Sequence, residues 1–81
     1  VGESGAQIEL FSFPNSPVRA SYPEACGLRH LAFVVENLEK AVDFLQATGV
    51  MCEPVRIDGL TSKRFTFFKD PDGLPLEMYE I

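Results

Sequence analysis

Residues 64–81 read R-F-T-F-F-K-D-P-D-G-L-P-L-E-M-Y-E-I, with two alternating apolar runs on either side of Asp70-Pro71-Asp72-Gly73. Pro71 fixes φ at the second position of a β-turn, and Gly73 accepts a positive φ. Both runs are long enough for strands and rich in aromatic residues. The segment therefore predicts an antiparallel β-hairpin.

The register of this hairpin decides which side chains share a face. A pairing of Asp70 with Gly73 places Thr66 opposite Glu77 and Arg64 opposite Tyr79. Alternation then gives an apolar core face of Phe65, Phe67, Leu74, Leu76 and Met78. The other face is expected to carry Arg64, Thr66, Phe68, Glu77 and Tyr79. A carboxylate on a face with so many apolar neighbours suggests that Glu77 binds something.

The composition is that of one small domain with a packed core. The chain has 81 residues, of which 46% are hydrophobic, and this excludes disorder. A net charge of −5, with no basic cluster beyond Lys63-Arg64, argues against a nucleic-acid partner. No apolar run approaches the roughly 18 residues of a membrane helix, and no signal-peptide pattern opens the chain. We therefore expect a cytoplasmic protein without a membrane partner.

The two cysteines, Cys26 and Cys52, lack metal-type spacing and are expected to be reduced thiols. The chain opens Val1-Gly2-Glu3-Ser4 without Met, which suggests the later part of a longer protein.

Two further strands and a loop are predicted in the first half. Residues 6–13 form a strand with Glu9 on an aromatic-bearing face, and residues 14–26, with three prolines, form a loop. Residues 27–35 form a strand that is apolar on both faces. It is therefore expected to lie deep in a covered sheet, with His30 pointing inward.

A helix over residues 38–48 follows, capped by Asn37 and ended by Gly49. Residues 50–57 form a third strand that Pro54 bends or confines to an edge. From residue 27 the order is strand, helix, strand, strand, strand, which predicts an α+β fold.

Three strand residues, Glu9, His30 and Glu77, are able to bind a metal and have mostly apolar neighbours. Each alone is more often structural or at the rim of a sheet. Buried carboxylates need a partner, however, and these three groups together can share one cation. The pattern indicates a metal site without identifying the metal.

Two segments, G-L-R-H-L-A-F-V-V-E-N-L-E-K-A-V-D-F-L and K-R-F-T-F-F-K-D-P-D-G-L-P-L-E-M-Y-E, resemble the second module of the glyoxalase I / bleomycin resistance / extradiol dioxygenase superfamily, the vicinal oxygen chelate proteins. The resemblance implies a βαβββ half-barrel module over residues 27–81. Residues 14–26 would be a linker, and residues 1–13 the last strand of a truncated first module.

Glyoxalase I-like members bind a divalent ion through two His and two Glu. The resemblance assigns metal binding to Glu9, His30 and Glu77, while the family's first His would precede this chain. It implies a lyase or isomerase that acts on a hemithioacetal of glutathione, with Glu77 favoured over Glu9 as the base and nickel, zinc or manganese as the ion.

Alternatives remain open at this level. Binding or resistance members of the superfamily usually lack the ligands, and extradiol dioxygenases need no carboxylate at the position of Glu9. Arg64 is expected either to contact a substrate anion or to pair with an acid such as Glu80. Because a truncated first module leaves the sheet with an open edge and face, a homodimer is expected.

Overall fold

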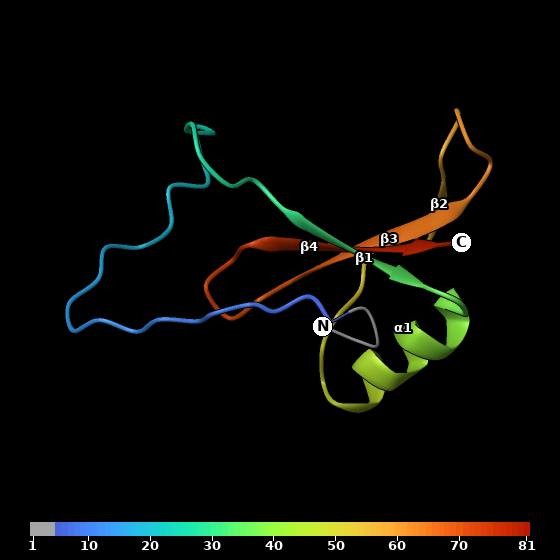
Figure 1. Cartoon of the computed structure of the whole chain (residues 1–81), viewed down its shortest axis with the longest axis horizontal. Helices are drawn as coiled ribbons and strands as arrows, with labels where there is room; N and C mark the ends of the chain where they lie inside the picture. Colours follow the sequence, from blue (N-terminus) through green and yellow to red (C-terminus); the bar gives the residue numbers. More distant parts are fainter. Residues whose placement is uncertain (1–4) are drawn as a thin grey trace.

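The computed structural model describes residues 5–81. Its elements are β1 (Leu31–Val35), α1 (Leu38–Ala47), β2 (Arg56–Ile57), β3 (Arg64–Lys69) and β4 (Pro75–Glu80). This order confirms the predicted α+β class and the βαβββ arrangement (Figure 1). No helix in the described part of the chain is long and apolar enough to cross a membrane.

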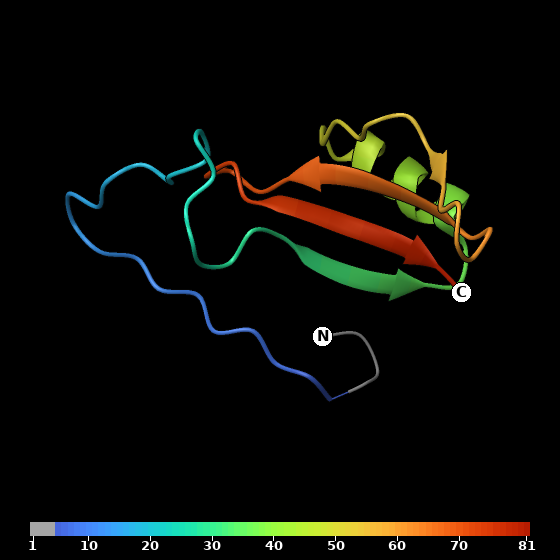
Figure 2. The ribbon, with the colours of Figure 1, turned by 90° about the horizontal axis from the view of Figure 1, so that it is seen from above.

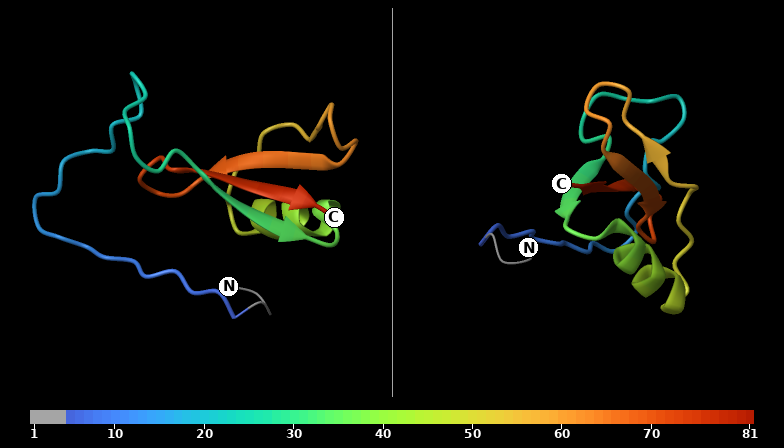
Figure 3. Two further views of the ribbon diagram at one scale, coloured as in Figure 1. Left: turned by 45° about the horizontal axis from the view of Figure 1, so that its top comes forward. Right: turned by 90° about the vertical axis from the view of Figure 1, so that its right-hand side faces the viewer.

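The four strands form one mixed sheet in the order β1-β4-β3-β2. β1 runs parallel to β4, whereas the β3–β4 and β2–β3 pairs are antiparallel. α1 packs against one side of this sheet only (Figure 3). We call that side the covered face and the opposite side the open face. The core lies on the covered face, where Leu38, Thr66 and Met78 are buried.

The helix begins and ends as its sequence predicts. The side chain of Asn37 accepts a hydrogen bond from the backbone N–H of Lys40 at 3.0 Å, which satisfies one of the free amides of the first turn. Gly49 follows the helix with φ 91°, a conformation that glycine adopts without strain. The buried stripe runs through Leu38, while Lys40 and Asp43 are exposed. α1 thus presents a single apolar side to the sheet.

The hairpin forms as predicted, but its predicted register is wrong by one residue. Asp70 pairs with Leu74 instead of Gly73: the N–H of Asp70 donates to the carbonyl of Leu74, and the N–H of Gly73 donates back to Asp70, both at 3.0 Å. Gly73, at φ 91°, is the extra left-handed residue of a bulged turn. The Oδ1 of Asp70 fixes this turn by accepting the N–H of Leu74 at 2.8 Å.

The bulge changes which side chains share a face, because a shift of one residue moves a strand's side chains relative to its partner's. Phe67 lies opposite Glu77, and Thr66 lies opposite Met78. The open face therefore carries Phe65, Phe67, Glu77 and Tyr79. The covered face carries Thr66, Phe68, Leu76 and Met78. The predicted core role of Phe65 and Phe67 was wrong, and both rings are half-buried on the open face.

The strand predicted over residues 27–35 is shorter and less buried than expected. β1 covers only residues 31–35 and lies at one edge of the sheet. Ala32 and Val34 are exposed on the open face, because α1 covers only the opposite side. His30 just precedes β1 and is partly exposed, so the prediction of a deeply buried histidine is wrong.

The strand predicted over residues 50–57 is reduced to the two-residue edge strand β2. The N–H of Glu53 still donates to the carbonyl of Phe67 at 2.9 Å. Pro54, which has no N–H, directly follows this contact, and strand pairing resumes only at Arg56. The expectation of an edge strand interrupted at Pro54 is confirmed.

Residues 5–30 form an arm of turns and irregular chain that begins beyond the β1 edge, loops out past one end of the sheet and returns to enter β1 (Figure 2). No strand is assigned within residues 6–13, contrary to prediction, because no described strand pairs with them. The start of the predicted first unit, residues 1–4, lies outside the described residues. The arm exposes Leu10, Phe11 and Phe13.

Candidate functional site

His30 and Glu77 meet on the open face of the sheet. The Nε2 of His30 lies 3.3 Å from the Oε1 of Glu77. β4 holds Glu77 next to Ala32 of β1, so the parallel pairing brings the residue just before β1 onto the same face. The Glu77 side chain is 15% exposed and that of His30 is 45% exposed. The carboxylate is thus sheltered, while the imidazole is reachable from solvent.

Phe67 supports both members of this pair. Its ring contacts the imidazole of His30 edge to face, with centroids 5.3 Å apart. It also lies directly opposite Glu77 across the β3–β4 ladder. An aromatic ring packed against an imidazole restricts the orientations of that imidazole. The bulged register therefore places Phe67 where it can position the histidine.

Arg56 is the guanidinium group of the open face. Its Cζ lies 5.0 Å from the ring centroid of Phe65 and 5.6 Å from that of Phe67. Its ion pair is with Glu53, at 3.5 Å between two side chains that are each 54% exposed. Such exposed pairs are weak. Arg56 therefore has donors available for a bound anion near the His30–Glu77 pair.

The sequence pattern did not point to Arg56 and instead predicted Arg64 on the face of Glu77. Arg64 instead lies on the covered side, where it binds the carboxylates of Glu80 at 2.8 Å and Glu39 at 3.0 Å. The ion pair with Glu80, the alternative to substrate contact, is what the structure shows. The one-residue bulge at Gly73 explains why Arg64 was placed on the wrong face. A register that includes this bulge puts Arg64 and Glu77 on opposite faces of the sheet.

Glu9 is not brought to this pair. It is exposed on the arm. Within residues 5–81, no group of three or more His, Cys, Asp or Glu side chains is arranged to hold a metal ion. Of the three predicted ligands, the structure brings together two.

The donor chemistry of the pair nevertheless fits a divalent cation. Two ligand atoms that share an ion at about 2.0–2.2 Å from each are separated by about 2.8–3.6 Å when they are adjacent in an octahedral or tetrahedral coordination sphere. The 3.3 Å between Nε2 and Oε1 lies in this range. Imidazole nitrogen together with carboxylate oxygen suits zinc, nickel and manganese. His30 and Glu77 thus have the donor atoms that two positions of a coordination sphere would need.

The cysteines take no part in this site. Cys26 and Cys52 are both free thiols, as expected for reduced cysteines. Burial raises the pKa of the Cys52 thiol, which disfavours the reactive thiolate.

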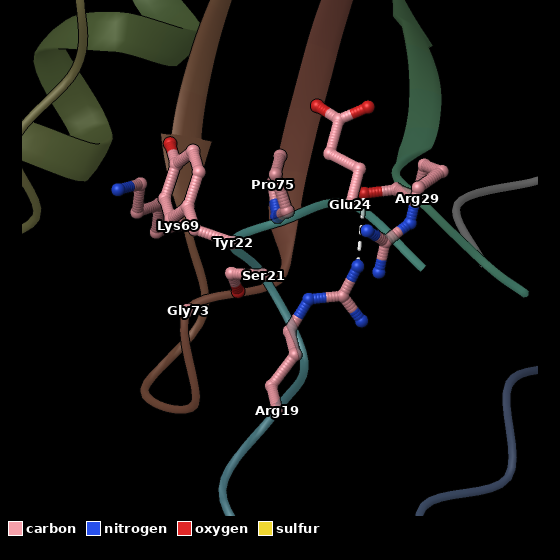
Figure 4. A pocket seen from close by; sticks show the side chains of 8 residues that line it. All are labelled: Arg19, Ser21, Tyr22, Glu24, Arg29, Lys69, Gly73 and Pro75. Atoms are coloured by element: carbon pink, nitrogen blue, oxygen red, sulfur yellow. Dashed lines mark hydrogen bonds between the residues drawn. The ribbon is translucent and has the colours of Figure 1, made fainter. Parts of the chain in front are cut away.

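A second group of polar residues lies where the arm meets the hairpin turn. It forms a pocket lined by Arg19, Ser21, Tyr22, Glu24, Arg29, Lys69, Gly73 and Pro75 (Figure 4). Arg19 donates from Nη2 to the carbonyl of Leu28 at 2.7 Å, and Arg29 donates from Nη2 to the carbonyl of Ala20 at 3.1 Å. Nothing in the sequence pattern singled out these two arginines.

Fold and site together define a βαβββ module with an imidazole–carboxylate pair on its open face. A sequence model of the Glyoxalase/Bleomycin resistance protein/Dioxygenase superfamily matches residues 1–78. The chain belongs to this superfamily.

Two curated relatives are each 64% identical over 73 residues: the uncharacterised proteins YaeR of Escherichia coli and YwkD of Bacillus subtilis. The match covers 90% of this chain and 57% of each relative, so the chain spans little more than half of their length.

Solved structures agree with the fold. A glyoxalase family protein from Enterococcus faecalis is 57% identical, with a TM-score of 0.77, over 82% of this chain and 52% of that one. A variant of the fosfomycin resistance protein FosX from Listeria monocytogenes is 25% identical, with a TM-score of 0.56, over 72% of this chain and 48% of that one. That FosX structure contains Mn(II) and 1S,2S-dihydroxypropylphosphonic acid.

Proposed function

We propose that the protein is a divalent-metal-dependent lyase or isomerase of the glyoxalase I type, which isomerises a hemithioacetal. The observation that carries this proposal is the 3.3 Å approach of His30 Nε2 to Glu77 Oε1 on the open face. Membership of the glyoxalase superfamily supports it.

In this proposal His30 and Glu77 hold the metal ion. A bound divalent ion supplies a Lewis acid that polarises the substrate carbonyl. Glu77 would be the base: its carboxylate removes the proton from the carbon that bears the hydroxyl and returns it to the former carbonyl carbon, while the hydroxyl proton passes to the former carbonyl oxygen, so that the hemithioacetal becomes a 2-hydroxy thioester. Phe67 keeps the imidazole of His30 in place through its edge contact. The partial burial of Glu77 limits access of water to the transferred proton.

Glu9 remains the proposed third ligand. Because the arm that carries Glu9 makes no strand pairs, it has to move, or a second copy has to supply the residue, for the carboxylate to reach His30 and Glu77. The exposed apolar side chains of the arm, Leu10, Phe11 and Phe13, favour such an association. We therefore propose a homodimer. Light scattering at micromolar concentration checks this, and a monomer there would contradict it.

Arg56 is proposed to bind the anionic part of the substrate. Glutathione adducts carry carboxylates, and a guanidinium group stacked on aromatic rings binds a carboxylate through two parallel hydrogen bonds. The contacts with Phe65 and Phe67 hold Arg56 beside the ring that touches His30. This arrangement would orient the carbonyl end of the substrate toward Glu77.

The function is tested by supplying the hemithioacetal of methylglyoxal and glutathione to the protein loaded with nickel, zinc or manganese, and following thioester formation. Glu77→Gln keeps the size of the side chain and removes its charge, and Lys40→Gln on the exposed side of α1 is the matched control. Turnover by wild type and Lys40→Gln, with loss of at least about a hundredfold in Glu77→Gln, supports the proposal. No turnover with any of the three metals contradicts it.

A second candidate function is the binding of a small phosphonate or related anion without isomerisation. It is favoured by Arg56 on the open face and by the structural likeness to FosX, whose variant was solved with a phosphonic acid and Mn(II). Binding of 1S,2S-dihydroxypropylphosphonic acid by calorimetry, together with silence in the hemithioacetal assay, would favour this candidate.

A further inference from the structure

We propose that Tyr79 is a positioning residue, which holds the guanidinium group of Arg56 over the aromatic rings of the open face. Tyr79 acts through Arg56 and through the loop that follows β2. The inference rests on the proposed function for one point, the role of Arg56 in binding the anionic part of the substrate.

The strand that carries Arg56 is too short to hold this side chain in place alone. β2 consists of two residues, and they pair with β3 through Arg56 opposite Phe65 and Ile57 opposite Arg64. Strands in globular proteins are usually roughly 3–10 residues long. The direction of the Arg56 side chain therefore depends on what fixes the chain before and after β2.

The chain before β2 is fixed at Glu53. The N–H of Glu53 donates to the carbonyl of Phe67 at 2.9 Å. The carbonyl of Glu53 accepts the hydroxyl group of the buried Thr66 at 2.6 Å. Both backbone groups of Glu53 are thus bound to β3.

The chain after β2 is organised around Asp58. The N–H of Asp58 donates to the carbonyl of Lys63, and the carbonyl of Asp58 accepts the N–H of Ser62, both at 2.8 Å. The Oδ1 of Asp58 accepts the N–H of Leu60, also at 2.8 Å. These bonds close residues 58–63 into one loop around the aspartate. The Oδ2 of Asp58 connects this loop to the sheet.

Tyr79 makes that connection. Its hydroxyl group donates to the Oδ2 of Asp58 at 3.4 Å, and it also hydrogen-bonds to the hydroxyl group of Thr61 in the same loop. Tyr79 is half-buried, and the hydroxyl of a tyrosine in such a position usually has a hydrogen-bond partner. The phenol therefore ties the end of β2 to β4, the strand that carries Glu77.

The ring of Tyr79 also supports the surface on which Arg56 lies. It stacks with the ring of Phe65, with centroids 6.5 Å apart and an angle of 17° between the planes. The Cζ of Arg56 lies 5.0 Å from the centroid of the same Phe65 ring. Arg56, Phe65 and Tyr79 are direct neighbours across β2, β3 and β4. Tyr79 thus contacts both the ring beside the guanidinium group and the loop that ends β2.

The first experiment does not depend on catalysis. It measures by NMR the proton chemical shifts of the Arg56 δ-methylene group in wild type, Tyr79→Phe and Thr61→Val. Because Arg56 lies over the rings of two phenylalanines, its resonances should be shifted upfield in wild type. Tyr79→Phe removes only the hydroxyl group, and Thr61→Val leaves every aromatic ring in place. Tyr22→Phe is the matched control, since Tyr22 is 87% exposed on the arm.

We expect Tyr79→Phe and Thr61→Val each to move the Arg56 resonances toward their random-coil positions, and Tyr22→Phe to leave them unchanged. A purely structural role of Tyr79 would lower the melting temperature of Tyr79→Phe without moving these resonances. Wild-type resonance positions in Tyr79→Phe or Thr61→Val, an equal change in Tyr22→Phe, or no upfield shift in wild type would overturn the proposal.

The second experiment relates this positioning to the proposed reaction. In the hemithioacetal assay, Tyr79→Phe should raise KM about threefold, as expected for the loss of one hydrogen bond, with kcat unchanged. Residues that act through the same contact are not additive, so Tyr79→Phe should have no further effect on KM in the Arg56→Lys background. An equal further rise in that background, or a fall in kcat at constant KM, would overturn the proposal. Absence of turnover in wild type would contradict the proposed function, whereas the NMR comparison would still decide the role of Tyr79.

Discussion

Arg64 donates two hydrogen bonds to the carboxylate of Glu80, from Nε to Oε1 at 3.1 Å and from Nη2 to Oε2 at 2.8 Å. Oε2 of Glu80 also accepts the backbone N–H of Leu38, the first residue of α1, at 3.0 Å. Nη1 of Arg64 reaches Glu39 in the same helical turn. This cluster joins the start of the helix to the two central strands, which explains why a guanidinium group lies on the covered side of the sheet.

Because of this cluster, the fold is expected to lose stability at acid pH. The hydrogen bonds from Arg64, and then that from Leu38, lower the pKa of Glu80 below its usual value. A carboxyl group whose pKa is lower in the folded than in the unfolded state stabilises the fold at any pH above its unfolded-state pKa. This stabilisation is lost as the pH falls through the folded-state pKa. Urea unfolding should therefore show a free energy that declines below about pH 4.3.

Glu80→Gln tests this assignment, with Glu36→Gln as the control because Glu36 is exposed. The Glu80 variant should be less stable at pH 7 and should lose less stability on acidification than wild type. The same acid dependence in wild type and Glu80→Gln would show that Glu80 is not responsible.

The bulged turn at Gly73 is predicted to need glycine. Gly73 has φ 91°, and a Cβ there meets no atom within 4 Å, so any cost of Gly73→Ala comes from the backbone alone. We expect a loss of about 1–2 kcal/mol in the free energy of unfolding. Gly59→Ala is the matched control, because Gly59 also has open space but no left-handed φ. Equal stability of the two variants in urea titrations would contradict the bulge.

Much of the fold was predictable because its signals are local. The cap at Asn37, the apolar stripe of α1 and the turn at Asp70–Gly73 each depend on a few neighbouring residues. The register was not predictable in this way, because Gly73 can sit either in a two-residue turn or in a bulge, and the two differ by one residue in the pairing. That single residue moved Arg64 to the covered side and left Arg56 on the open face.

The site was predictable only in part. His30 and Glu77 come together because β1 and β4 are neighbours in the sheet, and the superfamily resemblance implied that convergence. The position of Glu9 depends on what the arm pairs with, and the described residues contain no strand beside it. The backbone contacts of Arg19 and Arg29 depend on the path of an irregular loop, which hydrophobic periodicity does not determine.

The core is small, so its central residue is expected to be sensitive to truncation. Leu38 is fully buried under the cluster that begins α1. Leu38→Ala should cost about 2–5 kcal/mol through lost burial and the cavity that remains. Leu60→Ala is the control, since Leu60 is 97% exposed, and a change within about 0.5 kcal/mol is expected there. Thermal unfolding monitored by circular dichroism gives the melting temperatures of the two variants. Similar melting temperatures for Leu38→Ala and Leu60→Ala would contradict the placement of Leu38 in the core.

Arg56 is predicted to act on substrate binding more than on chemistry. Arg56→Lys keeps the charge but removes the planar group that stacks on Phe65 and donates in pairs. In the hemithioacetal assay, KM should rise about tenfold with little change in kcat. A fall in kcat at constant KM would instead place Arg56 in the chemical step.

Metal binding by His30 and Glu77 is measured most directly by calorimetric titration of nickel, zinc and manganese into wild type, His30→Ala and Glu77→Gln, with Lys40→Gln as the control. Circular dichroism establishes that each variant is folded. We predict that wild type and Lys40→Gln bind at least one of these ions. His30→Ala and Glu77→Gln should each bind it at least about tenfold more weakly. Equal affinity in wild type and both substituted proteins would show that the 3.3 Å pair is an ordinary hydrogen-bonded contact and not a metal site.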